Sequence, residues 1–144
     1  MLSAPMVACL FCEIVAGRSE AAMVLEEPQI VGFLDVRPVF VGHVLVVPRP
    51  HHGTLPEVPG ALVSTLFDAV QRLSAALPRA LGAEGTFVAV NNTVSQSVPH
   101  VHVHVVPRTK GDGLRGFFWP RVRYGSDEHL TSTAASIRSA LASG

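Results

Sequence analysis

The sequence has little of several features that would point to particular classes of protein. Only two cysteines occur among 144 residues, which excludes a framework of several disulfides. Eleven basic and eleven acidic residues cancel to a formal net charge of zero. A protein that binds the nucleic-acid backbone through bulk charge would be basic. We therefore expect no nucleic-acid partner.

Long hydrophobic runs are also missing. Apolar runs such as residues 44–47 are far shorter than the roughly 18 residues that a membrane-spanning helix needs. The apolar stretch 1–11 contains no Lys or Arg, so it lacks the basic start of a secretory signal peptide. These absences predict a cytoplasmic protein without a membrane partner.

The chain does contain enough apolar material for one core. Hydrophobic residues make up 48% of the sequence, and 144 residues are about one domain's worth of chain. No internal repeat, charge block or low-complexity segment divides it. We predict a single domain over residues 1–144.

Hydrophobic periodicity predicts five strands and three helices. Apolar and β-branched runs bounded by Pro or Gly predict strands at 23–26, 29–35, 42–47, 85–91 and 99–106. Apolar residues at spacings of three and four predict a long amphipathic helix over about 60–80, with shorter helices at 10–16 and 126–141. Strands on either side of one long helix, without strand–helix alternation, predict an α+β fold with a mainly antiparallel sheet.

The strand predicted at 99–106 contains His-Val-His-Val-His-Val-Val from residue 100. Because side chains alternate along a strand, His100, His102 and His104 share one face and the intervening valines fill the other. Imidazoles bring polar atoms that need partners, so three in a row do not serve a core. The row predicts a functional site.

Two kinds of chemistry suit such a row. Histidines two apart on a strand can chelate zinc, but hydrolytic zinc sites normally recruit carboxylates, and no Asp or Glu lies between Gly85 and Lys110. A neutral imidazole is also a nucleophile at neutral pH, provided that an acceptor holds its second nitrogen. The second interpretation is the stronger one.

The row, with Gln96 four residues before it, resembles the signature of the histidine triad (HIT) superfamily of nucleotide hydrolases and transferases. Further segments match in order over roughly residues 9–120: the Cys9-to-Gly17 segment, residues 33–38 and 42–48, the asparagines at 91 and 92, and Pro107-Arg108. This resemblance implies a HIT-like fold, a purine nucleotide or dinucleotide substrate and a homodimer.

The resemblance also implies roles for individual residues. It makes His102 the nucleophile that attacks the α-phosphorus and forms a covalent nucleotidyl intermediate, from which a nucleoside monophosphate is released. The implied residues around the phosphate and leaving group are His104, His43, Gln96, Ser97 and Asn91. Asp35 would accept the ribose hydroxyls, although an Asp before Pro38 is equally a turn residue.

One segment departs from the family's pattern. The loop at 91–96 is about two residues shorter than usual, and Ser95 stands where a Gly normally precedes the Gln. Glycine at that position would allow positive φ and a close backbone approach to phosphate. The backbone contacts of this loop are therefore expected to differ from those of the family.

The two cysteines, Cys9 and Cys12, have three interpretations. They could be a redox pair, although no strand–helix redox context surrounds them, or two small buried residues. The resemblance to zinc-carrying bacterial members implies a structural zinc site completed by His51 and His100, and Cys₂His₂ suits tetrahedral zinc. In that case His100 is structural.

Three functions compete at this level. The leading hypothesis is an enzyme that cleaves a phosphoanhydride or phosphoramidate bond of a nucleotide. The second is a nucleotide-binding regulatory module with weak or no turnover, which the altered loop favours. The third is a zinc-binding structural protein, which leaves His43, Gln96 and Asp35 unexplained.

Overall fold

The computed structural model describes residues 9–114 and 121–144. They form two compact units, divided between Asp112 and Gly113. The expectation of a single domain over 1–144 therefore stays a prediction. Within the part that is described, no helix is both long enough and apolar enough to cross a bilayer.

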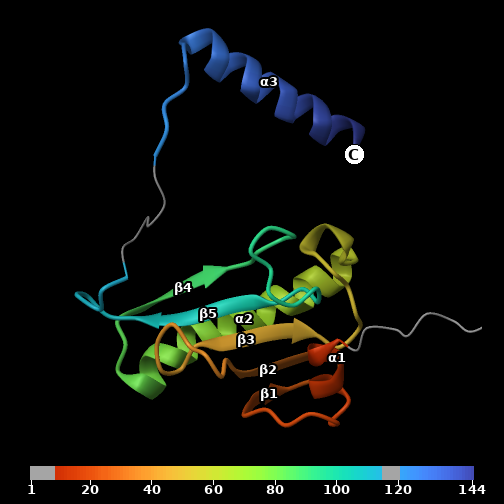
Figure 1. Ribbon diagram of the computed structural model, residues 1–144, viewed down its shortest axis with the longest axis vertical. Coiled ribbons are helices and arrows are strands. Elements are labelled where there is room, and N and C mark those ends of the chain that lie inside the picture. The colour runs from red at the N-terminus through yellow and green to blue at the C-terminus, as the bar shows by residue number, and fades with distance from the viewer. Residues whose placement is uncertain (1–8, 115–120) are drawn as a thin grey trace, which may run out of the picture. The chain divides into compact units, whose positions relative to one another are not determined.

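The first unit is built on a five-stranded antiparallel sheet with the strand order β1-β2-β3-β5-β4 (Figure 1). The strands are β1 (Met23–Glu26), β2 (Ile30–Leu34), β3 (Val44–Pro48), β4 (Gly85–Ala89) and β5 (Val103–Arg108). Every neighbouring pair is antiparallel. The predicted α+β fold with a mainly antiparallel sheet is confirmed.

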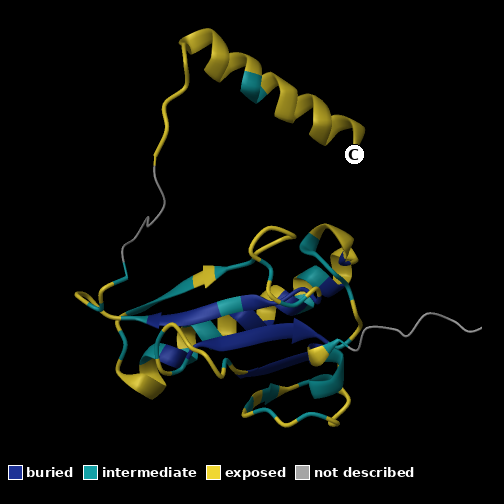
Figure 2. Cartoon of the chain, viewed as in Figure 1, coloured by how far each residue is buried: buried dark blue, intermediate teal, exposed yellow. Residues whose placement is uncertain are grey.

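One face of the sheet is covered by the long helix α2 (Gly60–Leu81), close to the predicted 60–80. The main core forms between the inward side chains of the central strands and a helix face of residues spaced three and four apart, namely Leu62, Leu66, Val70, Leu73 and Leu77. Val44 and Val46 lie in this core with Val103, and Figure 2 shows the two central strands as buried. The helix ends at Gly82, whose φ of 70° is easily adopted only by glycine.

The opposite face carries a smaller core under the short helix α1 (Leu10–Val15). Phe11 lies there with Phe33, Leu45 and Val47, so successive residues of β3 face opposite cores. Cys9 is the N-cap of α1, and its sulfur accepts a hydrogen bond from the Cys12 main-chain N–H at 3.4 Å. The cap therefore brings both cysteines to the same end of the helix.

The strand that follows the histidine triad (His100, His102 and His104) begins later than the predicted residue 99. β5 starts at Val103, so of the three histidines only His104 lies within the ladder. The preceding stretch pairs instead with the segment after β3, where the Val101 N–H donates to the His52 carbonyl oxygen at 2.8 Å. The alternation nevertheless persists, because Val101 lies in the α2 core together with Val103.

Two further segments complete the fold. A 3₁₀ turn, η1 (Leu55–Glu57), was not predicted; the Glu57 carboxylate accepts hydrogen bonds from the main-chain N–H groups of Gly53 and Thr54. The second unit contains the helix α3 (Asp127–Ser143), near the predicted 126–141, which has no fully buried residue (Figure 2).

Candidate active site and metal centre

The three histidines of the triad follow one another on the face of the sheet that carries α1. His100 and His102 are buried and His104 is half-buried. The rings of His102 and His104 lie 5.0 Å apart, and Phe11 stands edge-on to His102 at 5.0 Å. No role in the site was predicted for Phe11. Its position between Cys9 and Cys12 was the available signal, because the predicted zinc site would hold this segment beside His100.

Main-chain hydrogen bonds determine which nitrogen of His102 carries the proton. Its Nδ1 lies 2.8 Å from the His100 carbonyl oxygen. A carbonyl oxygen only accepts, so the Nδ1–H of His102 donates, and Nε2 keeps its lone pair. The arrangement leaves one imidazole nitrogen free to act as a nucleophile.

His43 joins the row from the loop before β3. Its Nε2 lies 2.9 Å from His104 Nδ1 and 3.8 Å from the Asp35 carboxylate. Burial lowers the pKa of both imidazoles, and with the neighbouring His102 and His43 it brings the pKa of His104 to about 4. Both rings are therefore neutral at pH 7.

Asp35 is held in a tight local turn. Its Oδ1 accepts a hydrogen bond from the Arg37 N–H at 2.9 Å, and its own N–H donates to the His43 carbonyl oxygen at 2.9 Å. Asp35 therefore shapes the turn with one oxygen and directs the other toward His43, while its binding of ribose hydroxyls stays a prediction.

The loop at 91–97 makes its own network of hydrogen bonds. Gln96 Oε1 accepts from the Thr93 N–H at 2.9 Å, while its Nε2 donates to the Gly53 carbonyl oxygen at 2.6 Å. Asn91 donates from its amide to the Ser95 carbonyl oxygen at 3.2 Å. The described contacts of Gln96 and Asn91 are therefore within the loop and to Gly53 rather than to the triad.

Backbone conformation agrees with the unusual sequence of this loop. Thr93 and Ser95 have φ angles of 69° and 60°, the left-handed region that glycine adopts most easily. Ser95 thus takes the conformation expected of the glycine it replaces. The exposed Ser97 follows at the end of the loop.

Asn92 is a further residue that sequence reasoning left without a role. Its Oδ1 accepts a hydrogen bond from the Leu55 N–H at 2.8 Å. Together with the Gln96–Gly53 bond, this contact fastens the loop to the segment that follows His51. The adjacent pair Asn91-Asn92 was the available signal, because Asn is typical of loops with side-chain-to-backbone hydrogen bonds.

The structure brings the side chains of Cys9, Cys12, His51 and His100 together. One atom from each, a Sγ or a ring nitrogen, lies within 4.8 Å of all the others. The sulfur–nitrogen and nitrogen–nitrogen contacts measure 3.1 to 3.5 Å. Zinc bonds of about 2.3 Å to sulfur and about 2.0 Å to nitrogen set tetrahedral ligands roughly 3.3–3.8 Å apart. The spacing therefore fits zinc.

The hydrogen bonds around this cluster also fit a metal. His100 Nε2 lies 2.8 Å from the Pro48 carbonyl oxygen, so Nε2–H donates and the Nδ1 lone pair faces the sulfurs. Burial lowers the pKa of His100, which keeps the ring neutral. Burial raises the pKa of the Cys12 thiol, with the neighbouring Cys9 adding to the effect, so binding of a metal there releases a proton.

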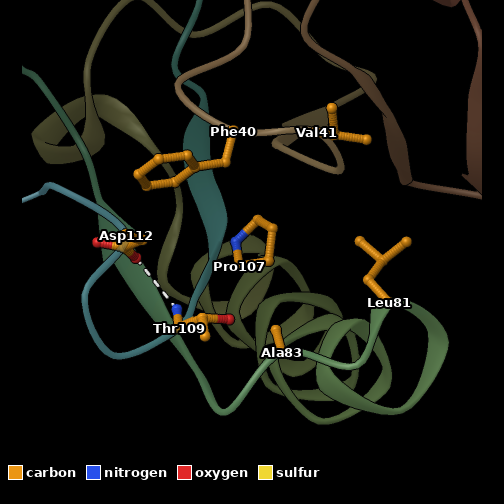
Figure 3. Close-up of a pocket in the computed structure, with 7 residues that line it drawn as sticks. All are labelled: Phe40, Val41, Leu81, Ala83, Pro107, Thr109 and Asp112. Carbon is orange, nitrogen blue, oxygen red and sulfur yellow. Dashed lines mark hydrogen bonds between the residues drawn. The ribbon is translucent and has the colours of Figure 1, made fainter.

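A separate cavity of about 250 Å³ lies where the end of α2 approaches the loop before β3. Figure 3 shows Phe40 and Val41 on one side of it and Leu81 and Pro107 on others. Asp112, at its rim, accepts a hydrogen bond from the Thr109 N–H at 3.0 Å. None of the triad histidines lines this cavity.

The family of the chain follows from comparison with known proteins. The model of the HIT domain matches residues 16–111, two thirds of the sequence and nearly all of the first unit. The chain belongs to the HIT domain family, as its sequence predicted.

Solved structures of the family are similar over nearly their whole length. A HIT family protein from Bacillus subtilis has a TM-score of 0.82 at 33% identity, covering 91% of this chain and 95% of that one. A zinc-bound histidine triad family protein from Mycobacterium smegmatis has a TM-score of 0.72 at 36% identity, covering 92% and 97%.

Two curated relatives have named activities. Adenylylsulfatase HINT3 from Arabidopsis thaliana is 33% identical over 74% of this chain and 55% of its own length. Adenosine 5'-monophosphoramidase HNT1 from Candida albicans is 30% identical over 78% of each chain. Both names denote hydrolases of adenine nucleotides.

Proposed function

We propose that this protein is a nucleotide hydrolase that cleaves a bond at the α-phosphate and releases a nucleoside monophosphate. The observation that carries the proposal is the hydrogen bond from His102 Nδ1 to the His100 carbonyl oxygen, since it leaves His102 Nε2 with a free lone pair. The names of HINT3 and HNT1 support an adenosine nucleotide that carries a sulfate or an amine as leaving group.

The reaction then proceeds in two steps. In the first, His102 Nε2 attacks the α-phosphorus, the bond to the leaving group breaks, and the leaving group departs with the electron pair and takes a proton from solvent. In the second, water attacks phosphorus and releases a proton to solvent, the nitrogen–phosphorus bond breaks, and its electron pair returns to Nε2. The buried main-chain bond to His100 holds the ring in position throughout.

Several residues are proposed to hold the substrate. We assign the ribose hydroxyls to Asp35 Oδ2 and the phosphate to His104, Gln96 and Ser97, with His43 orienting His104 and Asn91 shaping the loop. Gln96 must leave its bond with Gly53 to reach a phosphate, so we expect this part of the site to rearrange on binding.

We propose a structural zinc ion held by Cys9, Cys12, His51 and His100. The ion would join α1 to the start of the triad, and it would supply no chemistry to the reaction. The zinc-bound relative from Mycobacterium smegmatis supports this assignment together with the spacing of the four ligand atoms.

The deciding experiment is to trap the intermediate. Adenosine phosphoramidate labelled with ³²P at the α-phosphorus is mixed with the zinc-loaded protein and quenched within one turnover. We expect label on the protein that is stable in base and labile in acid, as phosphohistidine is, and no label on His102→Ala. His129→Ala, which changes an exposed histidine of α3, is the matched control. Normal single turnover without trapped label would indicate direct attack by water.

A nucleotide-binding regulatory module with weak or no turnover is the second candidate. The engaged amide of Gln96 favours it, because both ends already have partners in the loop and at Gly53. Incubation with adenosine phosphoramidate, adenylyl sulfate and diadenosine polyphosphates separates the two functions. Release of AMP favours the hydrolase, and tight binding without AMP release favours the module.

We further propose that the protein works as a cytoplasmic homodimer. β4 is an edge strand, and exposed apolar side chains lie on it and on α2, namely Val88 and Phe67 at 40% and 37% exposure. Sedimentation equilibrium tests the assembly directly. A mass of one chain at micromolar concentration would contradict it.

A further inference from the structure

The loop between β2 and β3 delivers a main-chain donor to His43. The Val39 N–H lies 3.1 Å from His43 Nδ1 and donates to it. An N–H cannot accept, so Nδ1 carries the lone pair and the proton of the neutral ring is on Nε2. One backbone group thus selects the tautomer of a buried histidine.

This choice propagates to the next ring. His43 Nε2–H faces His104 Nδ1 at 2.9 Å and donates to it. Because burial keeps both imidazoles neutral at pH 7, His104 must then carry its own proton on Nε2. The chain of hydrogen bonds runs in one direction, from Val39 through His43 to His104, and ends in a donor.

The loop is built so that this donor stays in place. It is closed at its ends by the Asp35 N–H and the His43 carbonyl oxygen at 2.9 Å, and it turns where the His43 N–H donates to the Phe40 carbonyl oxygen at 3.0 Å. Gly42 has a φ of 97°, a conformation that favours glycine, and a Cβ there would also force the end of the Leu81 side chain to move. Glycine therefore suits this turn best.

A metal ion is the alternative explanation for this cluster, because ligand atoms of Asp35, His43 and His104 lie within 4.8 Å of one another. A metal on His43 Nε2 would need the lone pair there, which moves the proton to Nδ1. That proton would point at the Val39 N–H, and two donors would face each other. The geometry therefore favours a hydrogen-bond chain over a metal site.

We propose that the Val39 main-chain N–H is a positioning group that fixes His43 and His104 so that His104 Nε2–H donates a hydrogen bond to the substrate bound beside His102. The identity of that substrate as a phosphoryl compound rests on the proposed function; the direction of the chain does not. His104 donates without transferring its proton, because it is neutral and its Nδ1 is already an acceptor.

The test reads the tautomers directly. Long-range ¹H–¹⁵N spectra of the zinc-loaded full chain with ¹⁵N-labelled histidine report which nitrogen of each ring is protonated. We expect Nε2–H on His43 and His104 and Nδ1–H on His102. Replacing the amide of Val39 by an ester, through incorporation of 2-hydroxyisovaleric acid, removes the N–H and keeps the side chain. His43 should then populate both tautomers. Val39→Ala, which keeps the N–H, and the same ester at Val36, which is 91% exposed, are the matched controls.

Steady-state kinetics distinguish a loss of positioning from a loss of folding. Loss of one hydrogen bond that orients a donor corresponds to roughly a tenfold fall in kcat. We expect this fall for the Val39 ester, with KM within about twofold of the wild type and both controls unchanged. An Nδ1–H tautomer of His43 in the wild type, a tautomer unaffected by the ester, or an unchanged kcat after the tautomer changes would each overturn the proposal.

The two proposals fail in different ways. Absence of turnover on every nucleotide, with the expected tautomers present, contradicts the hydrolase and leaves the hydrogen-bond chain intact. Titration of a zinc-loaded sample with Ni²⁺ tests the alternative that Asp35, His43 and His104 form a metal site. If Ni²⁺ perturbs the resonances of His43 and His104 stoichiometrically, the cluster is a metal site and the proposal is wrong.

Discussion

Two clusters of ligand-type side chains flank His102 and contrast in the direction of one main-chain hydrogen bond. The first contains Cys9, Cys12, His51 and His100, and the second contains Asp35, His43 and His104. In both, the potential ligand atoms lie within 4.8 Å of one another. In the first cluster, His100 donates from its outer nitrogen, Nε2, to the Pro48 carbonyl oxygen. In the second cluster, His43 accepts at its outer nitrogen, Nδ1, from the Val39 N–H.

The direction of the hydrogen bond at the outer nitrogen gives the two clusters different chemistry. A carbonyl on the far nitrogen directs a lone pair into the first cluster, where lone pairs and thiolates can surround a cation. An amide N–H on the far nitrogen directs a proton into the second cluster, which becomes a chain of donors and acceptors. Residue types alone do not distinguish a metal centre from such a chain, whereas the main-chain partner does.

The largest expected effect is at His102, which lies between the clusters and belongs to neither. His102→Ala should lower kcat by roughly 10⁴-fold or more, because the imidazole forms a bond in the reaction. Nucleotide binding should stay within about tenfold, since the ring is one contact of the ground state. Quenched-flow kinetics and calorimetric titration measure the two quantities. Activity within a few-fold of the wild type would remove His102 from the mechanism.

The sequence predicted most of the side chains that make up the two clusters. The period-two row from His100 placed imidazoles on one face and valines on the other, because the pattern is local. The grouping of Cys9 and Cys12 with two distant histidines came from resemblance, and periodicity alone could not have supplied it. The contacts that are hardest to predict are those of the main chain. No residue pattern indicates that the Val39 N–H contacts His43 or that the Pro48 carbonyl oxygen contacts His100.

The start of β5 shows the same limit. Residues 99–102 have the composition of a strand, yet their main chain pairs with the segment around His52, which is 49 residues away from Val101 in the sequence. Gln96 is similar, since its partner Gly53 lies in another loop. Local patterns predict elements, whereas partners across the fold depend on the packing of the whole chain.

A second prediction concerns the first cluster. Cys12→Ala should abolish stoichiometric zinc, whereas His129→Ala should retain one ion per chain. Zinc at a thousandfold excess over its Kd stabilises a folded protein by about 4 kcal/mol, so the urea midpoint should fall accordingly. The chemistry of molecules that remain folded should change much less. Metal analysis and denaturant unfolding test both statements, and less than a tenth of an equivalent of zinc in the wild type would contradict the metal centre.

The second cluster predicts a loss of stability in acid. Burial, with His102 and His43 nearby and Asp35 opposing, lowers the pKa of His104 from 6.5 to about 4. Between these values the unfolded chain binds a proton that the folded chain does not. The free energy of unfolding therefore falls as the pH falls from about 6.5 to 4 and changes no further below. The difference between 6.5 and about 4 corresponds to about 3.4 kcal/mol, which solvent screening of the half-buried ring reduces to the order of 2–3 kcal/mol.

The control for this prediction is His104→Gln, which cannot titrate. Urea unfolding at pH 7 and pH 4.5 should show a larger loss for the wild type than for the variant. Release of zinc in acid affects both proteins alike, so it cancels in the difference. Equal losses would mean that His104 titrates normally and that the second cluster is more hydrated than its geometry indicates.

The smallest effect is expected in the loop at 91–97, which is fastened to Gly53 by Gln96. Ser95 has a φ of 60°, where a Cβ is unfavourable by about 1 kcal/mol, and glycine carries no such strain but loses more entropy on folding. Ser95→Gly should therefore raise the free energy of unfolding by about 0.5 kcal/mol. Ser97→Gly, in the same loop but outside the left-handed region, should lower it by a similar amount. Thermal unfolding of the three proteins measures both signs. Destabilisation by Ser95→Gly would show that the Ser95 side chain contributes more than its backbone strain removes.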